Sequence, residues 1–182
     1  MMIYRLLSVL LDYPGDEVVA GLRAETAALG GGQALVRSLD QDELFSSEEQ
    51  GDIARFVEEL LALPDDEAQQ RYVQTFDMAA EHSLHLTHHI FGEEKTRGPA
   101  LIDLSEFYKS YGFEADPKEL PDYLPLMLEF ASTLDQNERR VFLGDVVKVL
   151  NVLAANLEKA GSPYAPLIRI IENHGALAKL AA

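Results

Sequence analysis

Apolar residues recur at helical spacing along almost the whole chain. The clearest stretch follows Ser46 and Glu49, which fit a capping box. The apolar positions behind that box share one helix face: Ile53, Phe56, Val57, Leu60 and Leu61. No run alternates convincingly at period two between turn signals, so no strand is predicted. The pattern predicts an all-α fold, a bundle of about eight helices in a single domain over residues 1–182.

Glycine and proline divide this pattern into elements. Pro14-Gly15 ends a first helix, and Gly30-Gly31-Gly32 closes a second helix over residues 16–29, so a flexible joint is predicted near residues 30–46. Asp122 or Tyr123 is predicted to start a helix with Pro125 in its first turn, and Asp122 is its predicted cap. The other helices are predicted from Ser46 to Pro64, from Asp65 or Asp66, over Arg97 to Tyr111, over 136–160, and from Pro163 to about His174.

Composition narrows the classes of function. The chain has no cysteine, which excludes disulfides, thiolate metal sites and cysteine-ligated iron–sulfur clusters. Its 31 acidic and 15 basic residues give a net charge of −16. Nucleic-acid phosphates and anionic lipids would repel such a chain, whereas cationic partners would be attracted. We therefore expect no nucleic-acid partner and no stable membrane association.

The chain opens with an apolar run, MMIYRLLSVLLDYPG, that needs a separate interpretation. It carries Arg5 and Asp12, has no small-residue cleavage site, and is too short to span a bilayer. We interpret it as a first helix rather than a signal peptide, and expect the protein in the cytoplasm. The sequence ends at Ala182.

Four histidines are the candidate metal ligands. In a continuous helix, His82, His85 and His89 would share one face, and three imidazoles there could bind zinc. Neighbouring apolar residues and the absence of HExxH favour structural or partner-contacting histidines instead, His88 included. No GxSxG and no nucleotide fingerprint is present, so nothing on physical grounds predicts an enzyme. A metal-dependent helical enzyme remains an alternative, as does a module that dimerises through apolar helix faces.

The segment of residues 72–130 is dense in aromatic residues and mixed charge, and holds four of the seven tyrosines. Aromatic residues at helical spacing are core by default. Tyrosine is also favoured where one side packs and the other meets a partner. A helical groove lined in this way and edged by acids would accept a basic amphipathic helix.

This segment resembles the NarJ family, the delta-subunit chaperones of respiratory nitrate reductases, which are related to the TorD/DmsD redox-enzyme maturation proteins. The likeness is carried, in order, by Tyr72, Phe76-Asp77, Ser83-Leu84-His85-Leu86, Gly92, Arg97-Gly98-Pro99-Ala100-Leu101-Ile102-Asp103-Leu104, Tyr108, Gly112 and Glu119-Leu120-Pro121-Asp122-Tyr123-Leu124-Pro125. The opening RLLSVLLDYP is similar to the family's Leu-Leu-x-Tyr-Pro start. Many family members continue past the equivalent of Ala182 into an acidic tail, so we expect either that this member is short or that its tail has been trimmed from the sequence.

The resemblance implies a function without catalysis and without a cofactor of its own. Such chaperones bind the basic N-terminal leader of the nitrate reductase catalytic subunit and hold that subunit until its molybdenum cofactor is inserted. The alternative client is another molybdoenzyme of the same superfamily, such as a selenate, perchlorate or sulfoxide reductase. Either a monomer or a weak homodimer is compatible with the sequence.

We expect the leader in a groove formed by the central segment. Asp77, Asp122 and Glu129 would face its cations, and Arg97 would either pair with Asp103 or Glu119 to position a helix or contact the client. The complete predicted peptide-binding set is Tyr72, Phe76, Asp77, His89, Arg97, Tyr108, Asp122, Tyr123, Met127, Glu129 and Phe130.

Overall fold

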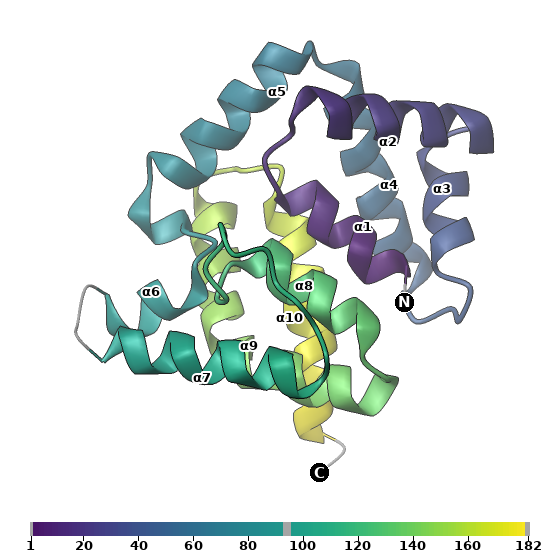
Figure 1. Cartoon of the computed structure of the whole chain (residues 1–182). Coiled ribbons are helices and arrows are strands. Elements are labelled where there is room, and N and C mark those ends of the chain that lie inside the picture. The colour runs from purple at the N-terminus through teal and green to yellow at the C-terminus, as the bar shows by residue number, and fades with distance from the viewer. Residues whose placement is uncertain (1, 93–95, 181–182) are drawn as a thin grey trace.

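The computed structural model describes residues 2–92 and 96–180, and its side chains within those ranges up to residue 176. These residues form an all-α fold, as predicted, and no strand is found among them; His85 and Tyr123 form one isolated bridge. The helices (Figure 1) are α1 (Met2–Leu11), α2 (Asp16–Leu29), α3 (Gly32–Leu39), α4 (Ser47–Ala62), α5 (Asp65–Tyr72), the π-helical turn η1 (Val73–Asp77), the 3-10 turn η2 (Ala80–His82), α6 (Leu86–Phe91), α7 (Arg97–Ser110), α8 (Leu124–Thr133), α9 (Gln136–Lys159) and α10 (Ala165–Leu180).

Helices α9 and α10 lie against each other and form the longest packed pair (Figure 1). A capping box starts α9, because Asp135 Oδ1 accepts from the Glu138 amide at 2.9 Å and the Glu138 carboxylate accepts from the Asp135 amide. Gly175 allows the close approach: a Cβ added there would lie 2.8 Å from the Leu143 carbonyl oxygen. The predicted helix over 136–160 is therefore confirmed, whereas α10 runs beyond the predicted end at His174.

Helix α8 lies at the centre of the core. Eight of its ten residues are buried, and Phe130 and Leu128 are fully inaccessible to solvent. α1 packs on α8, where the Ser8 hydroxyl donates to the Pro125 carbonyl at 2.6 Å. Pro125 lies in the first turn of α8, as predicted, where its missing N–H costs little.

Helices α2, α3 and α4 pack beside α1 (Figure 1). The prediction of a flexible joint near residues 30–46 overlooked α3. Gly30 and Gly31 adopt positive φ angles of 92° and 124°, but Gly32 is the first residue of α3. A Cβ at Gly32 would lie 2.8 Å from the Ala54 carbonyl oxygen of α4, so glycine is needed there for helix packing.

The predicted boundaries of α4 are confirmed. The Ser46 hydroxyl accepts from the Glu49 amide at 3.2 Å, and the Glu49 carboxylate accepts from the Ser46 amide at 2.8 Å. The helix ends at Ala62, before Pro64. Among the described residues, no helix is both long enough and apolar enough to cross a membrane.

Candidate functional site

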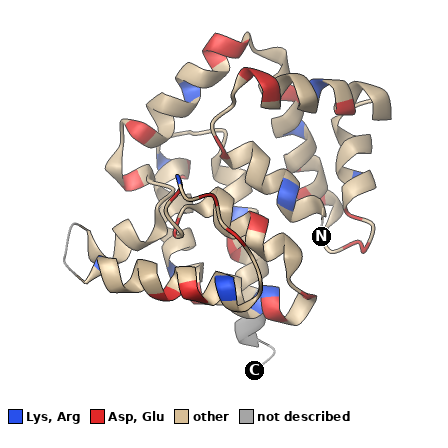
Figure 2. Cartoon of the chain, viewed as in Figure 1, with Lys and Arg blue, Asp and Glu red and all other residues tan. Residues whose placement is uncertain are grey.

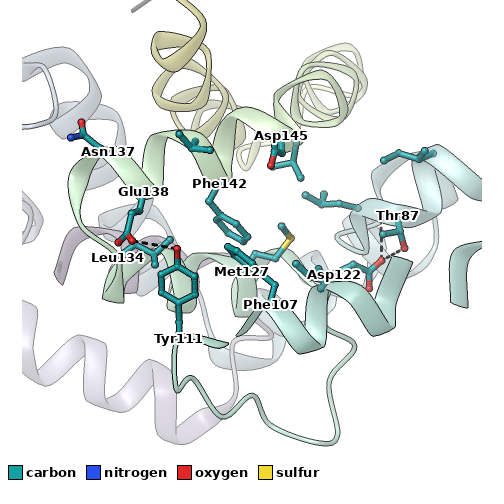
Figure 3. A pocket seen from close by; sticks show the side chains of 15 residues that line it. Thr87, Phe107, Tyr111, Asp122, Met127, Leu134, Asn137, Glu138, Phe142 and Asp145 are labelled. Atoms are coloured by element: carbon teal, nitrogen blue, oxygen red, sulfur yellow. Dashed lines mark hydrogen bonds between the residues drawn. The ribbon is translucent and has the colours of Figure 1, made fainter. Parts of the chain in front are cut away.

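A groove of about 550 Å³ lies between α6 and α7 on one side and α9 on the other (Figure 3). Its floor consists of buried apolar side chains that α6, α8 and α9 contribute: Leu86, Met127 and Phe142. Phe142 is held in place by Phe130 of α8, whose ring centroid lies 5.1 Å away. The floor is thus part of the hydrophobic core.

The walls of the groove carry large apolar side chains that face solvent. Ile90, Phe107, Tyr111 and Val141 are 57%, 39%, 47% and 64% exposed. Phe107 stacks on Phe142 at 6.0 Å, and so joins the α7 wall to the floor. A contiguous apolar surface of this kind is typical of a site that binds a partner.

Among the described residues, every charged side chain that lines the groove is acidic: Asp122, Glu138 and Asp145. Glu138 and Asp145 are exposed on α9, and the Tyr111 hydroxyl donates to Glu138 Oε1 at 3.3 Å across the groove. Figure 2 shows that acidic side chains are also spread over the other helices, in keeping with the net charge of −16. The groove therefore offers an apolar interior with a negative edge.

Asp122 differs from the other two acids because it is only 1% exposed. Its Oδ2 accepts from the Thr87 amide at 3.1 Å and from the Thr87 hydroxyl at 2.5 Å. Asp122 therefore caps the N-terminus of α6. The prediction that it caps the following helix was wrong: Tyr123 occupies the cap position of α8 and makes no side-chain cap hydrogen bond. The bend at Pro121-Asp122 directs the carboxylate toward α6 instead.

Burial raises the pKa of Asp122, but the contact with the His85 ring and the hydrogen bonds from Thr87 outweigh this effect and bring the pKa down to about 2. The His85 contact is the weaker of the two, because its Nδ1 lies 3.4 Å from Oδ1 and forms no well-aligned hydrogen bond. Asp122 is therefore a structural anion, held charged by the N-terminus of α6.

Arg97, the first residue of α7, joins this cluster. Its Nε donates to the Thr87 hydroxyl at 2.9 Å, and its guanidinium lies 3.4 Å from Asp122. The predicted pairing of Arg97 with Asp103 or Glu119 was wrong, because its acidic partner is Asp122, in the turn before α8, which the fold brings close to it. The expected helix-positioning role of Arg97 agrees with this geometry.

The structure brings two of the eleven predicted site residues, Asp122 and Met127, into the lining of the groove. Tyr108 and Phe130 lie buried beneath it, 4.6 Å apart between ring centroids. The other seven predicted residues do not line the groove, although Arg97 contacts Thr87 and Asp122, which do. Peptide contact by any of the eleven stays a prediction.

Tyr72 and Phe76 belong to a second aromatic cluster around Tyr164. The Tyr72 and Tyr123 hydroxyls lie 2.8 Å apart, and Tyr123 donates to Asp12 Oδ1 at 2.9 Å, which ties α8 to the end of α1. Both tyrosine tips therefore have partners within the protein. Asp77 is exposed and Glu129 half-buried.

The histidines do not share a helix face, and this expectation was wrong. His82 lies in the 3-10 turn η2, its Nδ1 3.0 Å from the Thr75 carbonyl. His85 precedes α6, and His89 Nε2 lies 2.7 Å from the Ser83 carbonyl. Across residues 2–92 and 96–180, no three His, Asp or Glu side chains are grouped so that they could hold a metal ion. The break at Ser83-Leu84 separates the rings.

Sequence reasoning missed most of the groove. Phe142 lies in the predicted helix over 136–160 and Tyr111 ends the predicted helix from Arg97, but neither is in the predicted peptide-binding set. A signal was present in α9, where Val141 lies off the buried stripe between two acids, Glu138 and Asp145. An apolar residue in that position marks an apolar surface outside the core.

Comparison with known proteins identifies the family to which the chain belongs. A family model described as the nitrate reductase delta subunit matches residues 42–169. The chain is 36% identical to the nitrate reductase molybdenum cofactor assembly chaperone NarJ of Escherichia coli (strain K12) over 116 residues, 64% of this chain and 49% of that protein. It is 33% identical to the probable chaperone NarJ of Bacillus subtilis (strain 168) over 165 residues, 91% of this chain and 83% of that protein. The match thus spans about half of the Escherichia coli relative.

Proposed function

Because the chain belongs to the nitrate reductase delta subunit family, we propose that it is an assembly chaperone for a nitrate reductase rather than an enzyme. On this proposal it binds the basic N-terminal leader of the catalytic subunit and holds that subunit while the molybdenum cofactor is inserted. The matched relatives are named as molybdenum cofactor assembly chaperones of nitrate reductase, which supports this role. The proposed place of action is the cytoplasm.

The observation that carries the proposal is the apolar groove between α7 and α9. Its exposed Phe107, Tyr111 and Val141 are of the types that interfaces use, and its shape between two helices suits an amphipathic helix laid in from outside. Burying an apolar anchor contributes roughly 2–3 kcal/mol, which ordering of the peptide partly offsets. A few anchors are therefore sufficient for reversible binding.

Charge supports a basic ligand. The lining residues that the structure describes include acids and no base, and the chain as a whole carries a net charge of −16. Exposed charges of this kind chiefly raise the association rate, so binding should weaken as salt rises. Reversible binding is what a chaperone needs, because the client has to leave after its cofactor is in place.

The test is calorimetric titration of this protein with a synthetic peptide of a nitrate reductase catalytic-subunit leader, at low and at high salt. Val141→Arg places bulk and a positive charge in the groove, and should weaken binding at least about tenfold because like charges meet there. Val152→Arg is the matched control: Val152 is also an exposed valine of α9, at 50%, but it does not line the groove.

Absence of binding at both salt concentrations would overturn the leader-binding proposal. Equal weakening by both valine substitutions would move the binding surface away from the groove. Leaders of selenate, perchlorate and sulfoxide reductases, used as competitors, distinguish among the candidate clients.

A further inference from the structure

The two exposed acids of the groove lie on one helix at a fixed separation. Glu138 and Asp145 are seven residues apart on α9, which is two helical turns or about 10.5 Å along the axis. Both therefore point to the same side of α9. Figure 3 shows them at different points along the groove, with Phe142 between them.

The third acid of the groove does not compete for an incoming cation. Asp122 is only 1% exposed, Thr87 and Arg97 contact its Oδ2, and its Oδ1 has no hydrogen bond but lies 3.4 Å from the His85 ring nitrogen Nδ1. In contrast, no cationic side chain of the described residues lies within ion-pairing distance of Glu138 or Asp145. Negative charge is thus available to a ligand at two points only along the described part of the groove.

The Glu138 carboxylate is also held in position by hydrogen bonds. Glu138 is held by the Tyr111 hydroxyl and by its own capping box with Asp135. Between the two acids, Val141 presents an exposed apolar surface and Phe142 an apolar floor. Along two turns of α9, an acidic side chain, an apolar surface and a second acidic side chain therefore follow one another.

From this arrangement, and resting on the leader-binding function proposed above, we infer that Glu138 and Asp145 set the register of the bound helix. They do so by pairing with two cations seven residues apart in the ligand, with apolar residues on the face between them. A spacing of seven keeps two side chains on nearly the same side of a helix, about 20° apart, so a helix lying along α9 can meet both acids at once. The groove thereby selects a spacing of charge as well as its sign.

The probes are two synthetic helical peptides of identical composition. In the first, two lysines lie seven residues apart on either side of a leucine pair. In the second, the lysines lie nine residues apart, which puts them on opposite sides of the helix, about 180° apart. Fluorescence anisotropy at low salt should show the first peptide binding about two- to fivefold more tightly, the effect of one additional exposed charge pair.

Two variants locate the effect. Glu138→Gln keeps the capping box, which accepts glutamine, and Asp145→Asn keeps the size of its side chain. Each should weaken the first peptide about two- to fivefold and remove its advantage over the second. Asp103→Asn, which removes an exposed acid of α7 that does not line the groove, should change neither affinity.

A charge exchange shows in which direction the bound peptide runs along α9. Asp145→Lys should weaken binding of the first peptide, and replacing one of its two lysines by glutamate should restore binding, whereas replacing the other should not. The lysine whose replacement restores binding is the one that faces Asp145.

The outcomes separate the two proposals. If both peptides bind equally well, or if Asp103→Asn acts as strongly as the α9 variants, the register inference is overturned while leader binding stands. If neither peptide nor any natural leader binds, both are overturned.

Discussion

Helices α7 and α8 are neighbours in sequence but differ in how they meet solvent. α8 buries eight of its ten residues, whereas α7, all fourteen residues of which are described, buries Tyr108 alone. Both contain several large apolar side chains, yet those of α7 include Ile102 and Phe107, which are 64% and 39% exposed. One helix holds the fold together, and the other keeps apolar surface available for a partner.

The two attachments of α7 explain how it stays in place with so little burial. Near its C-terminal end, the buried Tyr108 donates its hydroxyl to the Pro121 carbonyl at 2.7 Å. At its N-terminal end, Arg97 reaches Thr87 and Asp122. Between these points, Leu104 is partly buried against the core and Phe107 stacks on Phe142, but Ile102 stays exposed, so most of α7 remains uncovered.

Truncating a buried side chain of α8 is expected to give the largest change in the free energy of unfolding. Phe130 is fully buried, with the rings of Tyr108, Phe113 and Phe142 within 5.3 Å. Phe130→Ala should lower the free energy of unfolding by about 3–5 kcal/mol because it leaves a cavity. Urea denaturation followed by circular dichroism measures this. Ile102→Ala on α7 is the control and should stay within about 0.5 kcal/mol; similar losses would refute the division of roles.

Removing an attachment of α7 has a smaller and more local effect. Asp122→Ala deletes the cap of α6 and the partner of Arg97, and should cost about 2–3 kcal/mol as a buried, charge-assisted hydrogen-bond network is lost. Hydrogen exchange should accelerate in α6 and in the first turn of α7, with α8 still protected. Asp103→Ala, which removes an exposed acid of α7 outside the Asp122 cluster, should leave exchange unchanged. Uniform acceleration in α7 and α8 would contradict the local role.

Lowering the pH is expected to give the smallest change in the free energy of unfolding. The folded pKa of Asp122, about 2, lies below its ordinary value of 3.8, so its stabilisation is complete above that value and is lost as pH falls toward 2. The difference in unfolding free energy between the wild type and Asp122→Asn should shrink by about 1 kcal/mol from about pH 5 to about pH 3. Urea titrations at several pH values measure it. A difference independent of pH would mean that the carboxylate is not held charged.

Helix boundaries were predictable because their causes are local. The capping box of Ser46 and Glu49 and the breaks at Pro14 and Pro64 depend on residues a few positions apart, and the structure confirms each. α3 was missed for the opposite reason. In the sequence, Gly32 looks like a helix break. In the structure, it allows α3 to lie close to Ala54 of α4, which is far along the chain.

The candidate site was predicted only in part. Asp122 and Met127 were expected and do line the groove. Tyr72 and Phe76 were expected for their aromatic character, which suits a buried cluster as well as a binding surface, and the structure places them in the core. Residue type does not distinguish these two environments.

The sequence by itself determined that this protein is helical, acidic and similar to one family, because helical periodicity, charge and ordered motifs are properties of nearby residues and of their totals. Only the tertiary structure decided that Asp122 caps α6, that the histidines do not share a helix face, and that α7 and α9 leave a groove between them. Those features depend on which helix faces are covered by residues distant in the chain, and the face left uncovered is the one available to a partner.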